Sequence, residues 1–331
     1  MNYLVIDLII LFLLGIVLFY IFNIFCLRRK LLIDGFIKLE HKSYVNKIDV
    51  PITGGILIIF AIIFLLKDIS IVNKFFFIII FSLGLLSDIN KISSPKVRLF
   101  FQFFIVIIYI YFNDTYISAL RIDYIDQYLL NQFIFKIIFS TFCILILING
   151  SNFIDGVNTL NSGYYFIIFL NILFISNHYE IEAEIYNLKI IVTILLIFIL
   201  HNIFNKSFLG DGGSYLISFY AAIFFIHFSN QNNLVSPYYI AVMLWYPAFE
   251  NFFSLTRRLF FEKKKIKNAD NLHLHHLLYI FIRKKIIDNK LANTLTGLCI
   301  NFYNLIIIFI ANNFLYQTIP LLLILTLSMI F

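Results

Sequence analysis

The sequence has few charged residues and few cysteines, and both shortages limit what the protein can be. Only 13% of its 331 residues are charged and 61% are hydrophobic, whereas an ordinary soluble domain has about a quarter charged and about half apolar residues. One globular core cannot bury such an excess of apolar side chains, which excludes a soluble protein. The cysteines Cys26, Cys143 and Cys299 lie in or beside apolar runs without a CxxC pair, so neither a disulfide framework nor a cysteine metal site is expected.

The first apolar stretch, Tyr3 to Cys26, lacks the marks of a cleavable signal peptide. It is longer than a signal-peptide core, has no basic segment before it, and has no small-residue cleavage site ahead of Arg28. We expect it to remain in the protein as the first transmembrane helix.

Long apolar runs then follow one another along the whole chain. A helix needs about 20 apolar residues to cross about 30 Å of hydrocarbon. The runs lie near 3–25, 52–66, 72–87, 97–113, 133–149, 162–177, 188–204, 214–229, 234–255, 292–311 and 314–331. We therefore predict an all-α, polytopic integral membrane protein with 10–11 transmembrane helices, in which residues 1–331 form a single domain.

The basic residues gather in alternate loops. The loops after spans one, three, five, seven and nine are residues 26–51, 88–98, 150–161, 205–213 and 256–291. All but five of the 25 lysine and arginine residues fall in them, so the positive-inside rule places these loops in the cytoplasm and the N-terminus outside. The formal net charge of +7 thus reflects orientation beside membrane lipid, and no nucleic-acid partner is expected.

The same loops hold most of the residues that could carry chemistry. Asp211 stands between glycines in Gly210-Asp211-Gly212-Gly213, directly before an apolar span that Ser214 could cap. Glycines let backbone N–H groups approach an anion closely, and the helix N-terminus adds its positive dipole end. The segment suits a diphosphate; the alternative is a capped loop with an ordinary solvated aspartate.

Asp88 and Asp155 each follow an apolar span. Together with Asp211 they could supply the oxygen ligands that Mg²⁺ prefers, the ion also bridging substrate phosphates; the alternative is that each is a helix-end aspartate without a role. Asn149, Asn152 and Asn158 flank Asp155 at multiples of three residues, and spacings of three or four bring side chains to one helical face. Their amides would suit a sugar or a base.

Three histidines follow Asp270 in the last basic loop, namely His273, His275 and His276. Zinc binding is one interpretation, but HxHH is not a common structural-zinc spacing and no cysteine is near. Contact with phosphate fits better, with one histidine titrating near neutral pH. A basic interfacial segment that holds anionic lipid headgroups is a third interpretation.

Taken in order, these motifs resemble those of the polyprenyl-phosphate N-acetylhexosamine-1-phosphate transferase superfamily, glycosyltransferase family 4. The resemblance covers about residues 40–280. The matching segments are Pro51-Ile-Thr53-Gly54-Gly55, Asp88 with Arg98 and Gln102, Asn149-x-x-Asn152-x-x-Asp155-Gly156, Phe208-x-Gly-Asp211-x-Gly-Ser214 and His273-x-His275-His276. Two positions depart from the family pattern: Ser87 and Asn158 stand where aspartates are usual.

The resemblance implies roles for individual residues. Asp211 would bind Mg²⁺, or Mn²⁺ in its place, with Asp88 sharing the ion, and Asp88 and Asp155 would be the catalytic carboxylates. Phe208 would lie against uracil and Asn202 would contact the nucleoside, although its spacing is one residue short. The histidines would contact the diphosphate. Thr53, Arg98 and the asparagines at 149, 152 and 158 would complete the substrate-binding set.

The resemblance also implies an activity. A UDP-N-acetylhexosamine would donate its sugar 1-phosphate to undecaprenyl phosphate with release of UMP, at the cytoplasmic face of a bacterial inner membrane, as the first step of a cell-envelope glycan. The His-x-His-His spacing resembles the GlcNAc branch more than the pentapeptide translocases, which have three contiguous histidines. Residues 263–271 would select the sugar. A homodimer is compatible with this class of protein.

Alternatives remain on the sequence alone. A phospho-MurNAc-pentapeptide transferase belongs to the same superfamily. A transporter would also be polytopic, but its ionisable groups would lie near the bilayer midplane, whereas here they lie at the ends of spans. An inactive homologue is the third alternative, because Ser87 and Asn158 replace carboxylates.

Overall fold

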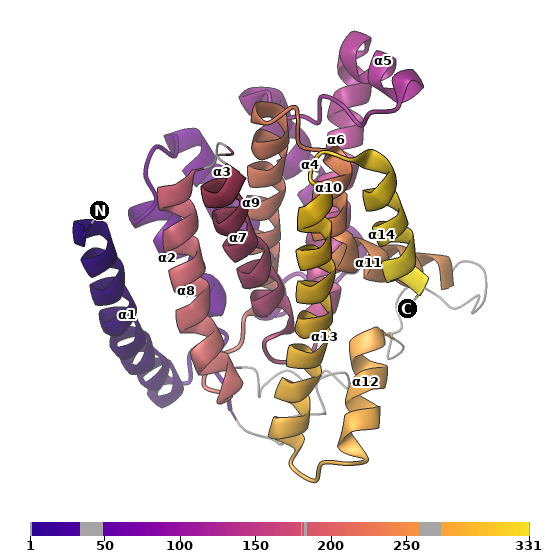
Figure 1. Cartoon of the computed structure of the whole chain (residues 1–331). Coiled ribbons are helices and arrows are strands. Elements are labelled where there is room, and N and C mark those ends of the chain that lie inside the picture. Colours follow the sequence, from indigo (N-terminus) through magenta and orange to yellow (C-terminus); the bar gives the residue numbers. More distant parts are fainter. Residues whose placement is uncertain (1, 34–48, 180, 182–183, 258–272, 331) are drawn as a thin grey trace.

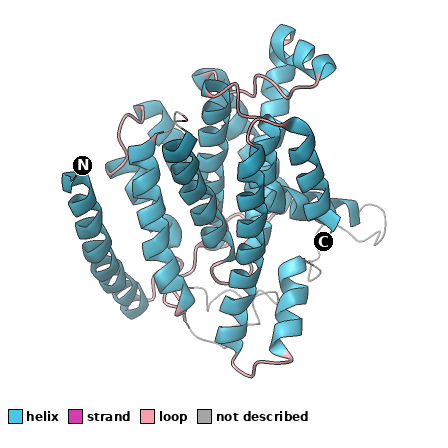
Figure 2. Ribbon diagram, in the orientation of Figure 1, coloured by secondary structure: helices cyan, strands magenta, loops and turns pink. Residues whose placement is uncertain are grey.

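The computed structural model describes residues 2–33, 49–179, 181, 184–257 and 273–330. Within them the chain is helical and has no strand, only isolated bridges between Ile33 and Pro51 and between Ile52 and Phe208 (Figure 2). The predicted all-α class is confirmed. The proposed sugar-selecting segment 263–271 and Asp270 lie outside the described residues.

The helices follow the apolar runs closely (Figure 1). They are α1 (Asn2–Arg29), α2 (Gly54–Phe64), α3 (Ile71–Asp88), α4 (Pro95–Asn113), α5 (Asp123–Asn131), α6 (Phe133–Ile154), α7 (Leu160–Tyr179), α8 (Ile185–Ile203), α9 (Gly210–Gln231), α10 (Pro237–Met243), α11 (Trp245–Arg257), α12 (Leu274–Arg283), α13 (Asn289–Ala311), the 3₁₀ turn η4 (Asn312–Phe314) and α14 (Thr318–Ile330). In the described part, eight helices are long and apolar enough to cross a membrane, and α2 and α14 are shorter apolar helices. The chain is thus a multi-pass membrane protein.

Helix ends carry the expected signals where the chain leaves the apolar run. Ser70 caps α3 by accepting a hydrogen bond from the backbone N–H of Asn73, and Asp288 caps α13 through Lys290. Pro95 and Pro237 open α4 and α10 at a position where a missing N–H costs nothing.

Helix α9 is the central element and α1 the most peripheral. Within the most apolar 18-residue window of each helix, 89% of the residues are buried in α9 but only 6% in α1. Glycines allow neighbouring helices to approach α9: a Cβ on Gly84 of α3 would lie 2.5 Å from the Cα of Gly212, and one on Gly55 of α2 would lie 2.6 Å from the nitrogen of Gly213. The start of α9 is therefore held tightly against α2 and α3.

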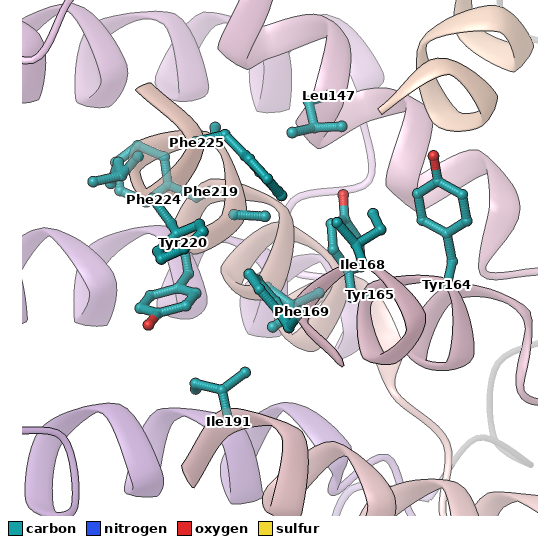
Figure 3. Close-up of a cluster of buried hydrophobic side chains, with 14 of the residues drawn as sticks. Leu147, Tyr164, Tyr165, Ile168, Phe169, Ile191, Phe219, Tyr220, Phe224 and Phe225 are labelled. Atoms are coloured by element: carbon teal, nitrogen blue, oxygen red, sulfur yellow. The ribbon is translucent and has the colours of Figure 1, made fainter. Parts of the chain in front are cut away.

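An aromatic core fixes the other side of α9 (Figure 3). Phe169 of α7 is fully buried, and its ring lies 5.8 Å from that of Tyr220 and 6.3 Å from that of Phe225, both on α9. Buried aromatic side chains contribute large contact areas and prefer such edge and offset arrangements. This packing makes α9 a rigid base for the residues at its N-terminus.

Three details differ from the sequence-based expectations. The run 234–255 is not one span but two helices, α10 and α11, which point in different directions (Figure 1); Pro247 cannot donate to a continuing helix and ends α10 before it. Ser214 does not cap α9, because the helix begins four residues earlier at Gly210. Helices α5 and α12 lie in segments expected to be loops.

The polar loops meet at one end of the bundle, which we call the polar end. Contacts at this end join the end of α3 to the start of α9, the α6–α7 connection to α13, and residues 51–54 to residue 208. Figure 1 shows α12 beside the start of α13 at the lower, polar end and α5 at the opposite end.

Candidate active site

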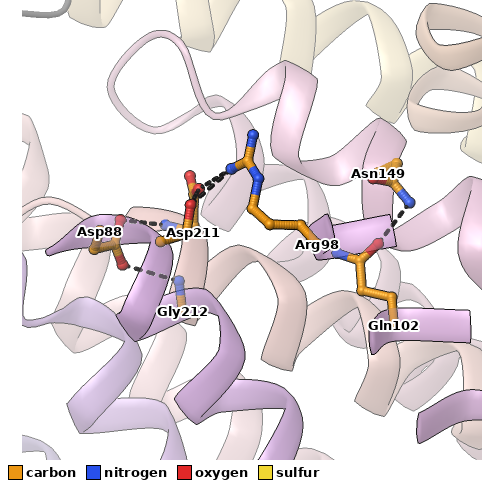
Figure 4. A network of polar contacts seen from close by, with 7 residues as sticks. Asp88, Arg98, Gln102, Asn149, Asp211 and Gly212 are labelled. Atoms are coloured by element: carbon orange, nitrogen blue, oxygen red, sulfur yellow. Dashed lines mark hydrogen bonds and ion pairs between the residues drawn. The ribbon is translucent and has the colours of Figure 1, made fainter. Parts of the chain in front are cut away.

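Asp211 forms a polar cluster with Ser87 and Arg98 at the polar end (Figure 4). Its Oδ2 accepts hydrogen bonds from the Ser87 hydroxyl at 2.6 Å and from Arg98 Nη1 at 2.7 Å. The same arginine nitrogen donates to Ser87 Oγ at 2.7 Å. Ser87 belongs to the last turn of α3 and Arg98 to the first turn of α4, so three helix ends converge on one carboxylate oxygen.

Asp88, the last residue of α3, caps the N-terminus of α9. Its Oδ1 accepts a hydrogen bond from the backbone N–H of Asp211 at 2.8 Å, and its Oδ2 accepts one from Gly212 at 3.0 Å (Figure 4). A carboxylate here satisfies two N–H groups that a helix start leaves unpaired and meets the positive end of the helix dipole. Gly210 has a φ of +76°, and its Cβ would lie 2.7 Å from Asp88 Oδ2, so glycine is required beside the cap.

Asp155 follows α6 directly and lines a cavity of about 60 Å³ between the α6–α7 connection and the start of α9. Amide side chains and two aromatic rings make up much of the wall, including those of Asn158, Asn202 and Phe208. Its amide-rich lining suits a polar ring of a substrate, because amides both donate and accept hydrogen bonds.

The amides of Asn158 and Asn202 also brace the wall of this cavity. Asn158 Nδ2 donates to Asn205 Oδ1 at 2.9 Å, Asn202 Oδ1 accepts from the backbone N–H of Thr159 at 2.6 Å, and Asn202 Nδ2 donates to the carbonyl of Ser207 at 2.9 Å. Thr159 and Asn205 have φ values of 64° and 54°, a region that non-glycine residues adopt rarely. The hydrogen bonds stabilise this unusual backbone.

Helix α13 supports the α6–α7 connection beside the cavity. Asn293 Oδ1 accepts a hydrogen bond from the backbone N–H of Asn158 at 2.6 Å, and Asn301 Nδ2 donates to the carbonyl of Thr159 at 2.8 Å. Between them, a Cβ on Gly297 would lie 2.1 Å from the carbonyl oxygen of Asn158. The three α13 residues are four apart and share one helical face. We call Asn293, Gly297 and Asn301 the α13 brace.

Thr53 and Phe208 lie side by side in an extended pair of segments. Thr53 is fully buried, and its hydroxyl is hydrogen-bonded to the side chains of Asn23 and Ser207. The backbone N–H of Gly54 donates to the carbonyl of Phe208 at 3.0 Å, while the half-buried Phe208 ring faces the cavity. Of the two predicted substrate contacts, only Phe208 lines open space.

The other amide candidates come from α6. Asn149 Nδ2 donates to Gln102 Oε1 at 3.0 Å, which ties α6 to α4 one turn beyond Arg98 (Figure 4). Asn152 follows one turn later on α6 and is half-buried. Asn149 therefore joins α6 to the helix that carries Arg98.

The three histidines form a stack at the start of α12. His273 Nδ1 lies 2.9 Å from Glu250 Oε2, and the backbone N–H of Leu274 donates to Glu250 Oε1 at 3.1 Å. The ring centroids of His275 and His276 are 4.2 Å apart. Glu250, which is buried in α11, thus fixes the start of the histidine segment.

His275 connects this stack to the Asp155 loop. It is completely buried, and a Cβ on Gly156 would lie 2.4 Å from its Nε2. Burial, followed by the neighbouring imidazoles of His276 and His273, holds the pKa of His275 well below its ordinary value. His275 is therefore neutral at pH 7.

Comparison with known proteins found similar sequences. Residues 70–229 match the model of glycosyl transferase family 4. We call this stretch, which is similar to that family, the glycosyl transferase family 4 region. Over 141 residues the chain is also 30% identical to phospho-N-acetylmuramoyl-pentapeptide-transferases from two strains of Borreliella burgdorferi, covering 37% of this chain. The aligned part spans 40% of the length of these relatives. Both findings support the superfamily predicted from the motifs.

The resemblance to glycosyl transferase family 4 implies a divalent cation, and Asp211 is the carboxylate best placed to bind it. The described residues contain no group of three His, Cys, Asp or Glu side chains placed to hold a metal ion. Both oxygens of Asp88 accept backbone hydrogen bonds, whereas Asp211 Oδ1 accepts none from the described residues. Mg²⁺ commonly takes one or two carboxylates and completes its shell with water and substrate phosphates, so Asp211 fits that mode.

Glu250 and the α13 brace are absent from the site set predicted by sequence. Glu250 is the one charged residue in the apolar run 234–255, and an ionisable residue inside such a run is by default a functional candidate. The regular spacing of Asn293, Gly297 and Asn301 in another apolar run was a second available signal. Both lie beyond the glycosyl transferase family 4 region.

Proposed function

We propose that the protein transfers an N-acetylhexosamine 1-phosphate, namely GlcNAc 1-phosphate, from a UDP-sugar to undecaprenyl phosphate and releases UMP. The observation that carries the proposal is the junction of Asp211, Arg98 and the capped start of α9 beside an amide-lined cavity, inside a glycosyl transferase family 4 region. The five alternate loops, which together hold all but five of the 25 lysine and arginine residues, favour a cytoplasmic position for this end in a bacterial inner membrane.

The chemistry required is a meeting of two anions. A phosphate oxygen of the acceptor attacks the sugar-bound phosphorus of the donor, the bond to the bridging oxygen breaks, and that oxygen leaves with UMP. The transition state is stabilised chiefly by positioning and by positive charge. Mg²⁺ on Asp211 would supply Lewis-acid charge neutralisation for the diphosphate.

The chain's own residues divide the remaining tasks. Arg98 and the histidine stack provide hydrogen-bond donors for phosphate oxygens, and Phe208 with the amides around the cavity accommodates the base. Asp155 orients the acceptor. A strong base is not needed, because the second pKa of a phosphate monoester is about 6 and the acceptor is already ionised near neutral pH.

The test is a transfer assay in membranes that contain the protein. Undecaprenyl phosphate, radiolabelled UDP-GlcNAc and Mg²⁺ should give lipid-soluble label, and excess UMP should return it to UDP-GlcNAc. Asp211→Asn should abolish the product. Asp114→Asn is the matched control, because Asp114 is exposed at the opposite end in a left-handed conformation that asparagine tolerates. Full turnover in Asp211→Asn would refute the metal assignment.

A second donor has support from the relatives. The two similar proteins are named phospho-N-acetylmuramoyl-pentapeptide-transferases, so the same membranes should be offered labelled UDP-MurNAc-pentapeptide. Transfer from this donor but not from UDP-GlcNAc would assign the protein to the peptidoglycan reaction. Transfer from neither, with the protein correctly inserted, would favour an inactive homologue.

A further inference from the structure

We propose that Arg98 is an internal counter-ion of Asp211 that weakens the binding of a divalent cation to this carboxylate, so that the cation binds together with a diphosphate rather than before it. The inference rests on the proposed function and adds an order of binding to it. It assigns Arg98 two successive partners, first Asp211 and then the phosphate oxygens of the donor.

The geometry supports competition for one carboxylate. Arg98 Nη1 and the Ser87 hydroxyl both contact Oδ2 of Asp211, and they also contact each other. A cation bound to the open Oδ1 would share the carboxylate with Arg98, whose Nη1 lies 2.7 Å from Oδ2. Two positive groups on one carboxylate repel each other unless a further anion neutralises them.

Arg98 is also poised to accept an anion. Its Nε is buried and has no hydrogen-bond partner in the described part of the protein, although buried donors are almost always paired. Its side chain is 20% exposed, so part of Arg98 is open to solvent. A phosphate oxygen would satisfy the unpaired donor through a charge-assisted hydrogen bond.

The charges around Asp211 explain why the cation and the diphosphate should bind together. Asp88 is compensated by two backbone N–H groups and the α9 dipole, and Asp211 with Arg98 forms a neutral pair. A divalent cation alone would leave this pair with a net charge of about +2, which a diphosphate would cancel. Cation and diphosphate should therefore bind synergistically, and Arg98 should be the source of the synergy.

The experiment measures Mn²⁺ binding to the full-length protein in nanodiscs by electron paramagnetic resonance, with and without UDP. The unsubstituted protein should bind Mn²⁺ weakly alone and more tightly with UDP. Arg98→Gln should bind Mn²⁺ about tenfold more tightly than the unsubstituted protein when UDP is absent, and should lose most of the UDP effect. Asp211→Asn should lose Mn²⁺ binding in both conditions.

Two further variants separate charge from packing. Arg98→Lys keeps the positive charge and should bind Mn²⁺ weakly without UDP, as the unsubstituted protein does. Ser87→Ala removes one hydrogen bond to Asp211 but leaves the ion pair, so its Mn²⁺ affinity without UDP should change far less than that of Arg98→Gln.

The outcomes distinguish this inference from the proposed function. If Arg98→Gln binds Mn²⁺ no more tightly than the unsubstituted protein while Asp211→Asn abolishes binding, the counter-ion role is refuted and the metal assignment stands. If Asp211→Asn retains Mn²⁺ binding, the counter-ion role and the metal assignment both fail, and the transfer assay alone then decides the activity.

Discussion

Oδ1 of Asp88 accepts a hydrogen bond from the backbone N–H of Asp211 at 2.8 Å. The two aspartates, 123 residues apart in sequence, thus play different parts: one fixes the start of α9, and the other presents its carboxylate from that start. Replacement of Asp88 should therefore affect the helix start more than the bound cation.

Asp88→Asn should destabilise the protein without changing its Mg²⁺ requirement. An asparagine has one acceptor oxygen for two N–H groups and lacks the charge that favours the helix N-terminus, which costs about 0.5–2 kcal/mol. Thermal unfolding in detergent should show a lower Tm than for Asp68→Asn, an exposed control at the opposite end. A shifted Mg²⁺ midpoint in the transfer assay would instead make Asp88 a metal ligand.

Glu250→Ala should weaken both the fold and the transfer reaction, because it removes the acceptor of the His273 ring and of the Leu274 N–H. Loss of a buried, charge-assisted hydrogen bond costs about 1.5–3 kcal/mol. Glu250→Gln keeps an acceptor of the same size and should retain more activity than the alanine variant. Equal turnover in the alanine variant and the unsubstituted protein would show that the histidine stack does not take part.

Gly156→Ala should lower turnover, because the new methyl group would lie 2.4 Å from Nε2 of the buried His275. Overpacking of this kind costs about 1–3 kcal/mol, and it would push the Asp155 loop and the histidine stack apart. Gly15→Ala is the matched control, since its methyl group meets only the flexible end of Ile197. Unchanged kcat and KM in Gly156→Ala would contradict the contact.

The stability of the protein should decline below about pH 6.5. The pKa of His275 is lowered in the folded state, whereas an unfolded histidine titrates near 6.5. Above that pH neither state is protonated and the residue has no effect. Below it only the unfolded state takes up the proton, which removes up to about 1.4 kcal/mol of stability per pH unit.

Unfolding midpoints measured between pH 7.5 and pH 5.5 test this predicted loss of stability. His275→Gln, which cannot be protonated, should reduce the decline, whereas substitution of the exposed His178 should leave it in place. A decline of the same size in His275→Gln would assign the pH dependence to other groups.

The sequence predicted the helical class and the gathering of the polar loops well, for a simple physical reason. Apolar runs of about 20 residues have few alternatives to spanning helices, and alternate loops of successive spans must share a side. The sequence alone therefore predicts Asp88, Asp155 and Asp211 at one end of the helix bundle.

Contacts between distant segments were less accessible to sequence reasoning. The pairing of Asp88 with the N-terminus of α9 depends on how closely α3 and α9 approach, which glycines at 84 and 212 determine. The division of 234–255 into two helices was indicated only by Pro247. Asn158 and Asn202 looked like substrate ligands, and the structure pairs their amides with the protein's own backbone and side chains.

The α13 brace has a consequence for how the protein matures. The chain is synthesised from its N-terminus and folds in that order, so the segments that carry Asp88, Asp155 and Asp211 are made before residue 293. Until then the backbone of Asn158 and Thr159 has neither of its α13 partners. The site should therefore be complete only after α13 has been synthesised and has packed against the α6–α7 connection.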